Sequence, residues 1–351
     1  MFSLYENPLY MQDISECSSW NVPWSLLHNR TVLISGGTGL IGSFLVDVIM
    51  HMNKTQELNC SLVIMCRNAM RAEERFYIYK NNTLLNIIEH DVSVPLKIES
   101  PCDYVLHLAS NTHPLAYAEW PIETITSNIY GTKNMLDYAV AKKCSRFLLA
   151  SSNEIYGENQ GDTEFFDEDY CGYINCNTLR AGYTESKRCS ESLCQAYIKQ
   201  KNSDCVIARL TRSYGPTIKM DDSKALSQFL KCALNKTDII LKSEGNQFYS
   251  FTYVADAVQG LLAVLLKGKN GEAYNIADAS SDITLKDLAC LIAKKSNVNV
   301  KNALPDAGEA QGFSKVTKAR LDGSKIKELG WNCNFPIEKG IEHTLRILGR
   351  E

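Results

Sequence analysis

Short apolar runs alternate with longer segments of helical periodicity over the first two thirds of the chain. Apolar spacing of three and four residues predicts helices at about 39–52, 122–140 and 183–201. Such alternation predicts an α/β fold, in which helices cover both faces of a doubly wound parallel sheet. The apolar runs that we expect to form its strands are 31–35, 61–66, 84–88, 104–108, 146–150 and 205–210.

The pattern changes at both ends of the chain. Residues 1–30 precede the first strong strand, and their sequence is compatible with a packed arm or with a disordered tail. Beyond about residue 216 the alternation weakens, and short strands such as 239–241 and 273–276 are mixed with helices. We therefore expect a leader at 1–30, a large sheet domain at 31–215 and a smaller, partly interleaved C-terminal α/β domain at 216–351.

Composition argues against several classes of function. The net charge of −3 gives no basic field for nucleic acid. The 13 cysteines show no CxxC pair and no zinc-type Cys/His spacing, so we expect reduced thiols and no metal. The N-terminus is too polar for a signal peptide, and no apolar run approaches the roughly 20 residues that cross a bilayer. These features predict a cytoplasmic protein without a membrane partner.

A glycine-rich turn lies between the first strand and the first helix. Gly36, Gly39 and Gly42 give the spacing GxxGxxG directly after the run 31–35. In this context glycines permit a tight turn, close approach of a pyrophosphate and close helix–sheet packing, and the helix N-terminus faces the phosphates. The turn predicts a Rossmann-type dinucleotide site. Its other expected contacts are Thr38, Leu40 and Ile41.

The end of the second strand bears on which cofactor binds. Enzymes that use NAD commonly place an Asp or Glu there for the ribose 2′-hydroxyl. Here Arg67 and Asn68 follow the strand, and an arginine is suited to a bidentate bond with the 2′-phosphate of NADP. A solvated surface arginine is the alternative. We expect NADP(H) to be favoured over NAD(H).

Later strand ends supply further expected cofactor contacts. Asp91 and Val92 follow the third strand, where they are placed to hold the adenine amino group. Leu108, Ala109 and Ser110 follow the fourth strand and are expected to pass beside the cofactor. Each motif alone is weak, but their order along a doubly wound sheet supports the dinucleotide site.

Tyr183 and Lys187 form a YxxxK pair at the start of a predicted helix. A spacing of four places both side chains on one helix face, and a nearby ammonium lowers the pKa of a phenol. Such a tyrosine exchanges a proton with a sugar hydroxyl or carbonyl near neutral pH. Ser152, after the fifth strand, lies where a further donor to the reacting oxygen is needed. A surface Tyr–Lys pair is the alternative.

The chain resembles the NAD-dependent epimerase/dehydratase family of extended short-chain dehydrogenases over about residues 30–345. The likeness rests on the glycine turn followed in order by HLAS, NIYGT, SSNEIYG and YTESK. Among the branches of the family, the motifs look most like UDP-glucuronate decarboxylases, with the 4,6-dehydratases as close relatives. The resemblance implies a catalytic triad of Ser152, Tyr183 and Lys187. It also implies that Glu154 serves decarboxylation or dehydration, and that Asn128, Tyr183 and Lys187 contact the cofactor.

Three departures from the family pattern bear on the reaction. Asn153 stands where the dehydratases carry an acid that helps to expel a hydroxyl as water. Arg212 and Thr217 replace the asparagine and the final arginine of RxxNxYGPR, and Tyr249 replaces the arginine of QxRxFxYVxD. Arg212 is able to supply what position 249 lost, with neutral drift as the alternative. The loss also removes an anchor for a substrate carboxylate, which argues against decarboxylation. The substrate contacts expected from the resemblance are His113, Asn153, Arg212, Gln247 and Tyr249.

These observations lead to three hypotheses. The first is an NADPH-dependent reductase of a nucleotide-linked keto-sugar, because Arg67, Asn153 and Tyr249 all depart from the redox-neutral pattern. Resemblance to proteins that occur beside cytidylyltransferases in surface-polysaccharide gene sets implies a CDP-linked ketose, reduced to a CDP-alditol for surface (capsule) polysaccharide. The second is a redox-neutral epimerase, 4,6-dehydratase or UDP-glucuronate decarboxylase with bound NAD. A non-catalytic NADP-binding regulator is a remote third. Because members of this family commonly pair two helices per subunit in a four-helix bundle, we expect a homodimer through 122–140 and 183–201.

Overall fold

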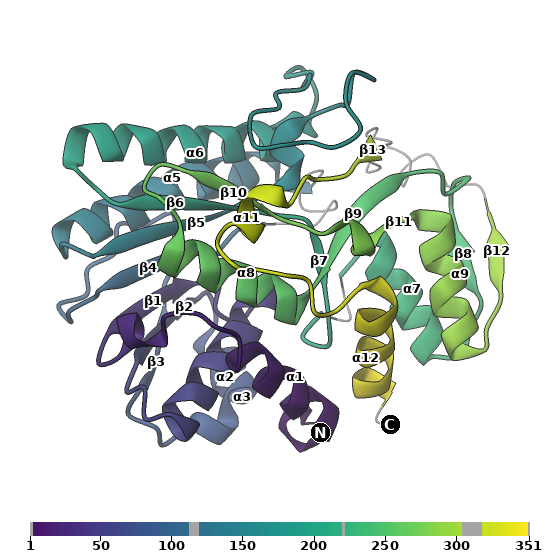
Figure 1. Ribbon diagram of the computed structural model, residues 1–351. Helices are drawn as coiled ribbons and strands as arrows, with labels where there is room; N and C mark the ends of the chain where they lie inside the picture. Colours follow the sequence, from purple (N-terminus) through teal and green to yellow (C-terminus); the bar gives the residue numbers. More distant parts are fainter. Residues whose placement is uncertain (1–2, 112–118, 220–221, 304–317, 350–351) are drawn as a thin grey trace.

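The computed structural model describes residues 3–111, 119–219, 222–303 and 318–349. At its centre is a seven-stranded sheet in the order β10–β6–β5–β4–β1–β2–β3, and every neighbouring pair runs parallel (Figure 1). The order runs outward in both directions from β1, as a doubly wound sheet requires. The predicted fold class is therefore confirmed. The strands are β1 (Thr31–Ser35), β2 (Ser61–Cys66), β3 (Leu85–Glu89), β4 (Tyr104–His107), β5 (Arg146–Ser152), β6 (Cys205–Leu210) and β10 (Ala273–Ile276).

Helices cover both faces of this sheet. The helices α5 (Pro121–Ala141) and α6 (Ala181–Lys201) pack together over one face, and α2 (Leu40–Thr55) and α8 (Val254–Lys267) cover the other (Figure 1). Val32 and Ile34 belong to the core beneath α2 and α8, whereas Leu33 belongs to the core beneath α5 and α6. Burial on both faces explains why the strands are continuous apolar runs rather than alternating ones.

The C-terminal part adds smaller sheets at one side of the large one. β9 (Phe248–Tyr253) pairs with β7 (Arg212–Tyr214), β11 (Asp282–Thr284) and β13 (Lys318–Ala319), and β8 (Ile239–Leu241) pairs with β12 (Val300–Asn302). Because β10 and α8 belong to the large sheet and its cover, the two parts are interleaved. The boundary near residue 215 stays a prediction. The remaining helices are α3 (Ala69–Arg75), α7 (Ala225–Leu234), α9 (Leu285–Ser296), α11 (Ser324–Lys327) and α12 (Ile337–Gly349).

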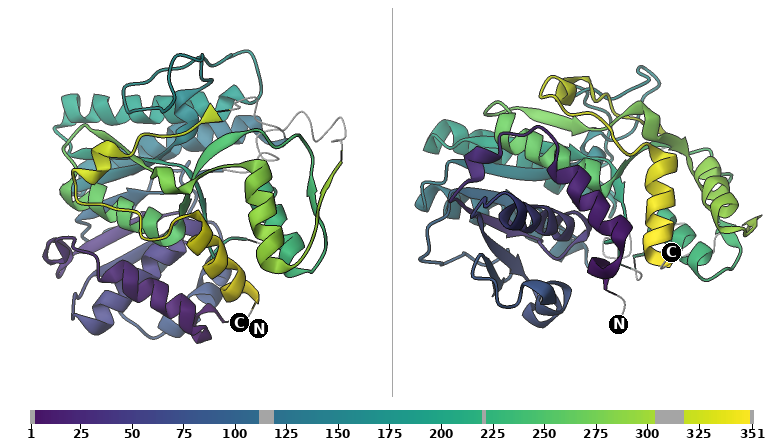
Figure 2. Two further views of the ribbon diagram at one scale, coloured as in Figure 1. Left: turned by 45° about the vertical axis from the view of Figure 1, so that its right-hand side comes forward. Right: turned by 60° about the horizontal axis from the view of Figure 1, so that its bottom comes forward.

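The leader is a packed arm. Its helix α1 (Pro8–Ser18) lies against α2, α8 and α12, so that both chain ends lie on one side of the molecule (Figure 2). The buried Asp13 carboxylate accepts a hydrogen bond from the Tyr253 hydroxyl and lies 2.7 Å from Nδ1 of His343. The Tyr10 hydroxyl donates to Asp47 of α2 at 2.5 Å. These hydrogen bonds join polar groups of the arm to residues that lie far along the chain. Of the packed arm and the disordered tail that the sequence left open, the structure therefore shows the packed arm.

Two further observations concern membrane spans and cysteines. No helix in the described ranges is both long and apolar enough to cross a bilayer. All 13 cysteines are free thiols, distributed between core and surface.

Candidate active site

The glycine turn joins β1 to α2 at the carboxyl edge of the sheet. Gly36 has a φ of +75°, in the left-handed region that favours glycine. A Cβ on Gly36 would lie 2.8 Å from the backbone nitrogen of Ala109 and 2.9 Å from the carbonyl carbon of Leu108. A Cβ on Gly42 would lie 2.4 Å from the carbonyl oxygen of Gly36. The turn therefore lets backbone approach backbone closely. With Gly39 as the N-cap of α2, it fits the pyrophosphate of a dinucleotide.

A positively charged and a negatively charged side chain, Arg67 and Glu89, lie near the end of β2. Arg67 is exposed, and the side chain of Asn68 accepts the Arg71 N–H at 2.9 Å, which caps α3. Glu89, at the end of the neighbouring β3, accepts the Ala69 N–H at 2.8 Å. Inspection of β2 alone missed this carboxylate, because it reaches the strand end from the next strand. The preference of Arg67 for a 2′-phosphate stays a prediction.

Local contacts hold the loop after β3. Asp91 accepts hydrogen bonds from the N–H and the hydroxyl of Ser93, at 2.8 and 2.7 Å, and these bonds lower the pKa of its carboxyl. The carbonyl of Val92 accepts the side-chain N–H of Asn134 at 2.9 Å. A Cβ on Gly131 would lie 2.9 Å from the Val92 side chain. The loop is thereby fixed against α5, and its contact with adenine stays a prediction.

A buried amide joins three elements beside the expected cofactor. Asn128, on α5, accepts the Ser110 hydroxyl at 2.7 Å and donates to the Ser186 hydroxyl at 2.9 Å. Ser110 follows β4, and Ser186 lies on α6 three residues after Tyr183. The amide therefore fixes α6 relative to the loop after β4, and with it the position of Tyr183.

Ser152, Tyr183 and Lys187 converge where β5 meets α6. Ser152 ends β5, and Tyr183 and Lys187 lie one turn apart on α6. All three side chains are buried. Hydrogen bonds connect the Tyr183 hydroxyl to Ser152 and Ser110, and the Lys187 ammonium donates to the carbonyl oxygen of Ala150 at 2.9 Å. The structure thus brings together the three residues that the resemblance grouped as a triad.

Burial dominates the ionisation of Tyr183. It raises the pKa of the phenol to about 12, and the Glu154 carboxylate adds to the increase. Hydrogen bonds to Ser152 and Ser110 and the charge of Arg180 act in the opposite direction. The expectation of a lowered phenol pKa needs correction, because burial outweighs the groups that favour the phenolate. Arg180 supplies a cation that favours the phenolate, whereas the ammonium of Lys187 is bonded to a backbone carbonyl.

A buried ion pair lies behind Lys187. Glu191, one turn further along α6, accepts the Arg209 guanidinium at 2.8 and 3.1 Å and the Ser151 hydroxyl at 2.5 Å. Burial lowers the pKa of Lys187 to about 8, and Glu191 offsets part of this decrease. Our sequence analysis missed Glu191. The available signal was its spacing of four from Lys187, which continues the helix face of Tyr183.

Glu154 and Arg180 form an ion pair beside the triad. Glu154 lies in the 3-10 turn η4 (Asn153–Tyr156) after β5, and its N–H donates to the Ser152 hydroxyl at 3.2 Å. Arg180 is the N-cap residue of α6, and its Nη2 lies 2.6 Å from Oε1 of Glu154. The two side chains are 28% and 23% exposed. The sequence analysis did not single out Arg180, although it lies three residues before Tyr183.

The substrate side depends on two adjacent strands. β7 pairs with β9, and the guanidinium carbon of Arg212 lies 3.5 Å from the centroid of the buried Tyr249 ring. Because Ser152 pairs with Leu210 across β5 and β6, Arg212 follows at the same edge of the sheet. Two of the positions that depart from the family pattern, 212 and 249, therefore touch each other. The guanidinium that contacts the side chain at position 249 belongs to the neighbouring strand, β7.

Three further residues of the substrate side lie in different parts of the fold. The Thr217 hydroxyl donates to the carbonyl of Leu40 at 2.7 Å, which links the chain after β7 to the first turn of α2. Gln247 accepts the Ser243 hydroxyl at 3.4 Å. Asn153 is buried in the turn that carries Glu154. His113 lies outside the described residues.

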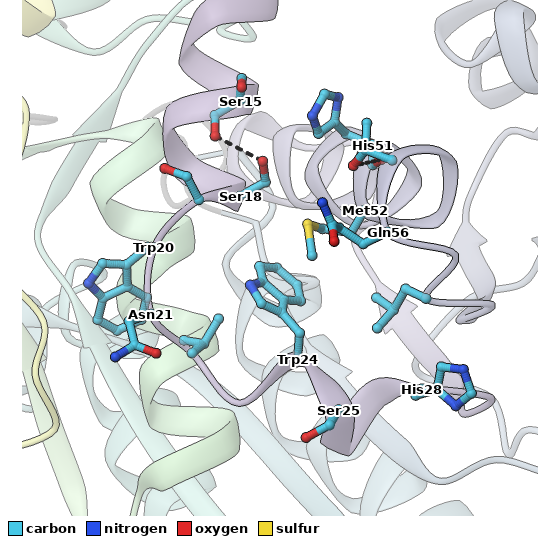
Figure 3. A pocket seen from close by; sticks show the side chains of 14 residues that line it. Ser15, Ser18, Trp20, Asn21, Trp24, Ser25, His28, His51, Met52 and Gln56 are labelled. Atoms are coloured by element: carbon cyan, nitrogen blue, oxygen red, sulfur yellow. Dashed lines mark hydrogen bonds between the residues drawn. The ribbon is translucent and has the colours of Figure 1, made fainter.

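A cavity of about 830 Å³ lies away from all of these residues. It is formed by the end of the N-terminal arm and the end of α2, with Trp20, Trp24, His51 and Gln56 in its wall (Figure 3). None of the expected site residues lines it. The candidate active site is therefore defined by converging polar groups rather than by cavity size.

Sheet, glycine turn and Ser–Tyr–Lys group together define the class of protein. Residues 32–277 match the NAD dependent epimerase/dehydratase family, and the chain belongs to that family. It is an enzyme of the extended short-chain dehydrogenase/reductase type. The family expected from the motifs is thereby confirmed.

Two individual relatives show which enzymes of the family the chain is similar to. The chain is 33% identical over 324 residues to UDP-glucuronic acid decarboxylase 1 of Danio rerio, covering 92% of this chain and 73% of the relative. It is 32% identical to UDP-glucuronic acid decarboxylase 3 of Arabidopsis thaliana, covering 89% of this chain and 87% of the relative.

Solved structures show the same fold at lower identity. A dTDP-glucose 4,6-dehydratase of Streptomyces venezuelae with NAD bound has a TM-score of 0.77 and 22% identity, over 91% of this chain and 96% of that one. A UDP-glucuronic acid 4-epimerase of Bacillus cereus in complex with UDP-glucuronic acid and NAD has a TM-score of 0.75 and 21% identity, over 92% and 99%.

Proposed function

We propose that this enzyme acts on a nucleotide-linked sugar and regains its cofactor unchanged in each turnover. Support comes from its curated relatives, which are decarboxylases, and from similarly folded dehydratases and epimerases with NAD bound. The net reductase that led our sequence analysis becomes the second candidate. Its substrate, a CDP-linked ketose, has no support from these comparisons, and neither has a role in surface polysaccharide.

Within this class we propose decarboxylation of a nucleotide-linked uronic acid. The observation that carries the proposal is the stacking of Arg212 on Tyr249 at 3.5 Å. A guanidinium at this edge can bind a carboxylate through two parallel hydrogen bonds, so the replacement at 249 no longer argues against the reaction. Dehydration is disfavoured, because the amide of Asn153 cannot donate a carboxyl proton.

The chemistry follows from the positions of the side chains. Bound NAD would supply the acceptor, and later the donor, of a hydride. Tyr183 takes the proton from the sugar hydroxyl that is oxidised, and Ser152 donates a hydrogen bond to the same oxygen. A ketone at C4 places the C5 carboxylate of a uronic acid in a β-keto acid, which loses CO₂ readily. The bonding electron pair passes into the C4 enolate, C5 then takes up a proton, and the ketone is reduced by the returned hydride. Arg212 holds that carboxylate, and Glu154, paired with Arg180 at 2.6 Å, orients the sugar beside Ser152.

The decisive experiment begins with the purified protein. Its retained cofactor should be NAD, released on denaturation and identified by mass. UDP-glucuronic acid should then yield CO₂ and a UDP-pentose without net change in NADH absorbance, and Tyr183→Phe serves as the inactive control. Stoichiometric oxidation of NADPH by CDP- or UDP-linked ketoses would instead establish the reductase.

The reductase is kept as second candidate because of one observation, the exposed Arg67 at the end of β2. If Arg67 binds a 2′-phosphate, Arg67→Ala should weaken NADPH binding by about 1–3 kcal/mol, the range for a bond to a charged group. Binding of NADH should change little. An equal loss for both cofactors would exclude NADP selectivity at this residue.

We also propose a homodimer through α5 and α6. Support comes from large apolar side chains that are exposed along these helices. Ile122 and Tyr130 of α5 are 70% and 54% exposed, and Leu179, just before α6, is 67% exposed. Light scattering at micromolar concentration should give twice the mass of the chain, and a monomer would contradict the proposal.

A further inference from the structure

The ion pair of Glu154 and Arg180 places two opposite charges close to the tyrosine. Glu154 reaches the site from η4, and Arg180 reaches it from the N-cap position of α6, with 2.6 Å between Nη2 and Oε1. Arg180 and Tyr183 are three residues apart, and side chains at that spacing are neighbours on a helix. The two charges therefore act on one phenol with opposite sign.

Two other charged groups on the described part of α6 have partners of their own. Lys187, on the same helix, donates to the carbonyl of Ala150 at 2.9 Å. Glu191 lies behind Lys187 and is paired with Arg209 at 2.8 Å. The charged groups that act most strongly on the phenol are therefore Glu154, which raises its pKa, and Arg180, which lowers it.

We propose that Arg180 is a positioning residue that holds the Glu154 carboxylate and balances its charge on Tyr183. The inference rests on the proposed function, in which Tyr183 exchanges a proton with the sugar. It assigns to Arg180 a role that this function does not include. Glu154 without Arg180 would be a partly buried, uncompensated carboxylate, which disfavours a phenolate beside it. The effects of the two residues on Tyr183 are of opposite sign, as their electrostatic influence indicates.

A titration tests this balance without any substrate. The probe is 3-fluorotyrosine introduced at position 183, because fluorine lowers the phenol pKa toward the range in which the protein stays folded, and ¹⁹F NMR reports the phenolate. The titration midpoint should fall in Glu154→Gln and rise in Arg180→Ala, with the parent protein between them. Movement in the same direction for both variants, or no movement, would overturn the proposal.

Kinetics supply the second test. Arg180→Ala should lower kcat roughly 10- to 100-fold, less than loss of the general acid–base itself, with a smaller change in KM. Arg180→Ala should also shift the pH profile to higher pH. Arg180→Lys should restore part of the rate and abolish that shift. In a Glu154→Gln background, Arg180→Ala should have little further effect, since residues that act through one another are not additive.

Lys133→Ala is the matched control. It removes an ion pair of the same 2.6 Å length, between Lys133 and Asp137 on the exposed side of α5, and should leave both titration and kinetics unchanged. Additive losses in the double variant, together with an equal fall in melting temperature, would assign Arg180 a structural role and overturn the proposal. If no nucleotide-linked uronic acid is turned over, the proposed function fails, and the order of the ¹⁹F midpoints still decides the inference.

Discussion

The cofactor half and the substrate half of the candidate site are built in different ways. In the first, β1, the glycine turn and α2 follow one another along the chain, and the backbone itself forms the cradle. In the second, the key contact joins Arg212 of β7 to Tyr249 of β9, two strands that are distant in sequence and paired in space. Motif spacing therefore reports the first half directly, while the second becomes visible only when strands are paired.

The two halves also differ in what they tolerate. A Cβ at Gly42 would lie 2.4 Å from the carbonyl oxygen of Gly36, so the backbone of the turn itself would have to move. A stacked arginine and tyrosine depend on side chains, so the same charge can be supplied from either strand. The cofactor half therefore requires particular residues at particular positions, whereas the substrate half requires only that a guanidinium be supplied by one of the two strands.

The largest effect is expected where the halves meet. Tyr183→Phe keeps the ring and removes the hydroxyl, so turnover should fall roughly 10²- to 10⁴-fold, as for loss of a general acid–base. Retention of NAD and affinity for the nucleotide sugar should barely change. Rapid-quench measurement of product, with cofactor content by mass, checks both. A variant with normal turnover would remove Tyr183 from the chemistry.

The next effect should be confined to the substrate half. Arg212→Gln should raise KM for a nucleotide-linked uronic acid by about 10- to 100-fold, corresponding to a bond between charged groups worth about 1.5–3 kcal/mol. Cofactor retention should be unaffected. The double variant Arg212→Asn with Tyr249→Arg restores the arrangement of the family pattern and should recover most of the affinity. If the double variant is worse than the single one, the guanidinium is not interchangeable between the strands.

A smaller effect should be confined to the cofactor half. Gly42→Ala should destabilise the protein by about 1–3 kcal/mol, as for overpacking, and should empty the cofactor site. Thermal unfolding and cofactor content measure the two effects. Gly349→Ala is the control, because a Cβ there meets its nearest atom at 3.9 Å. Full retention of NAD in Gly42→Ala would mean that the turn does not require this close approach.

The smallest effect is a pH dependence. The pKa of Lys187 is lowered by burial to about 8, so the ammonium is present below that pH and is lost above it. If the charge is needed, turnover should fall roughly tenfold per unit above pH 8 through one ionisation. Lys187→Arg keeps the charge at all these pH values, so this fall above pH 8 should be absent even if the rate is lower. An unchanged alkaline limb in Lys187→Arg would assign that limb to another group.

The sequence by itself determined the doubly wound sheet, the glycine turn and the Ser–Tyr–Lys group. Each is encoded by residues that lie close together or in a fixed order, and the strands are recognisable because burial on both faces requires continuous apolar runs. For the same reason the bounds of β1, β2 and β6 agree with the apolar runs at 31–35, 61–66 and 205–210.

The tertiary structure alone decided the contacts between distant segments. Glu89 reaches the end of β2 from β3, Arg180 pairs with Glu154 across two elements, and Arg212 meets Tyr249 across paired strands. It also decided that the leader is an arm, through the bonds of Asp13 to Tyr253 and His343. The physical reason is that a charged side chain is placed by its partner. That partner is set by the register of strands and the packing of helices, which a linear pattern does not contain.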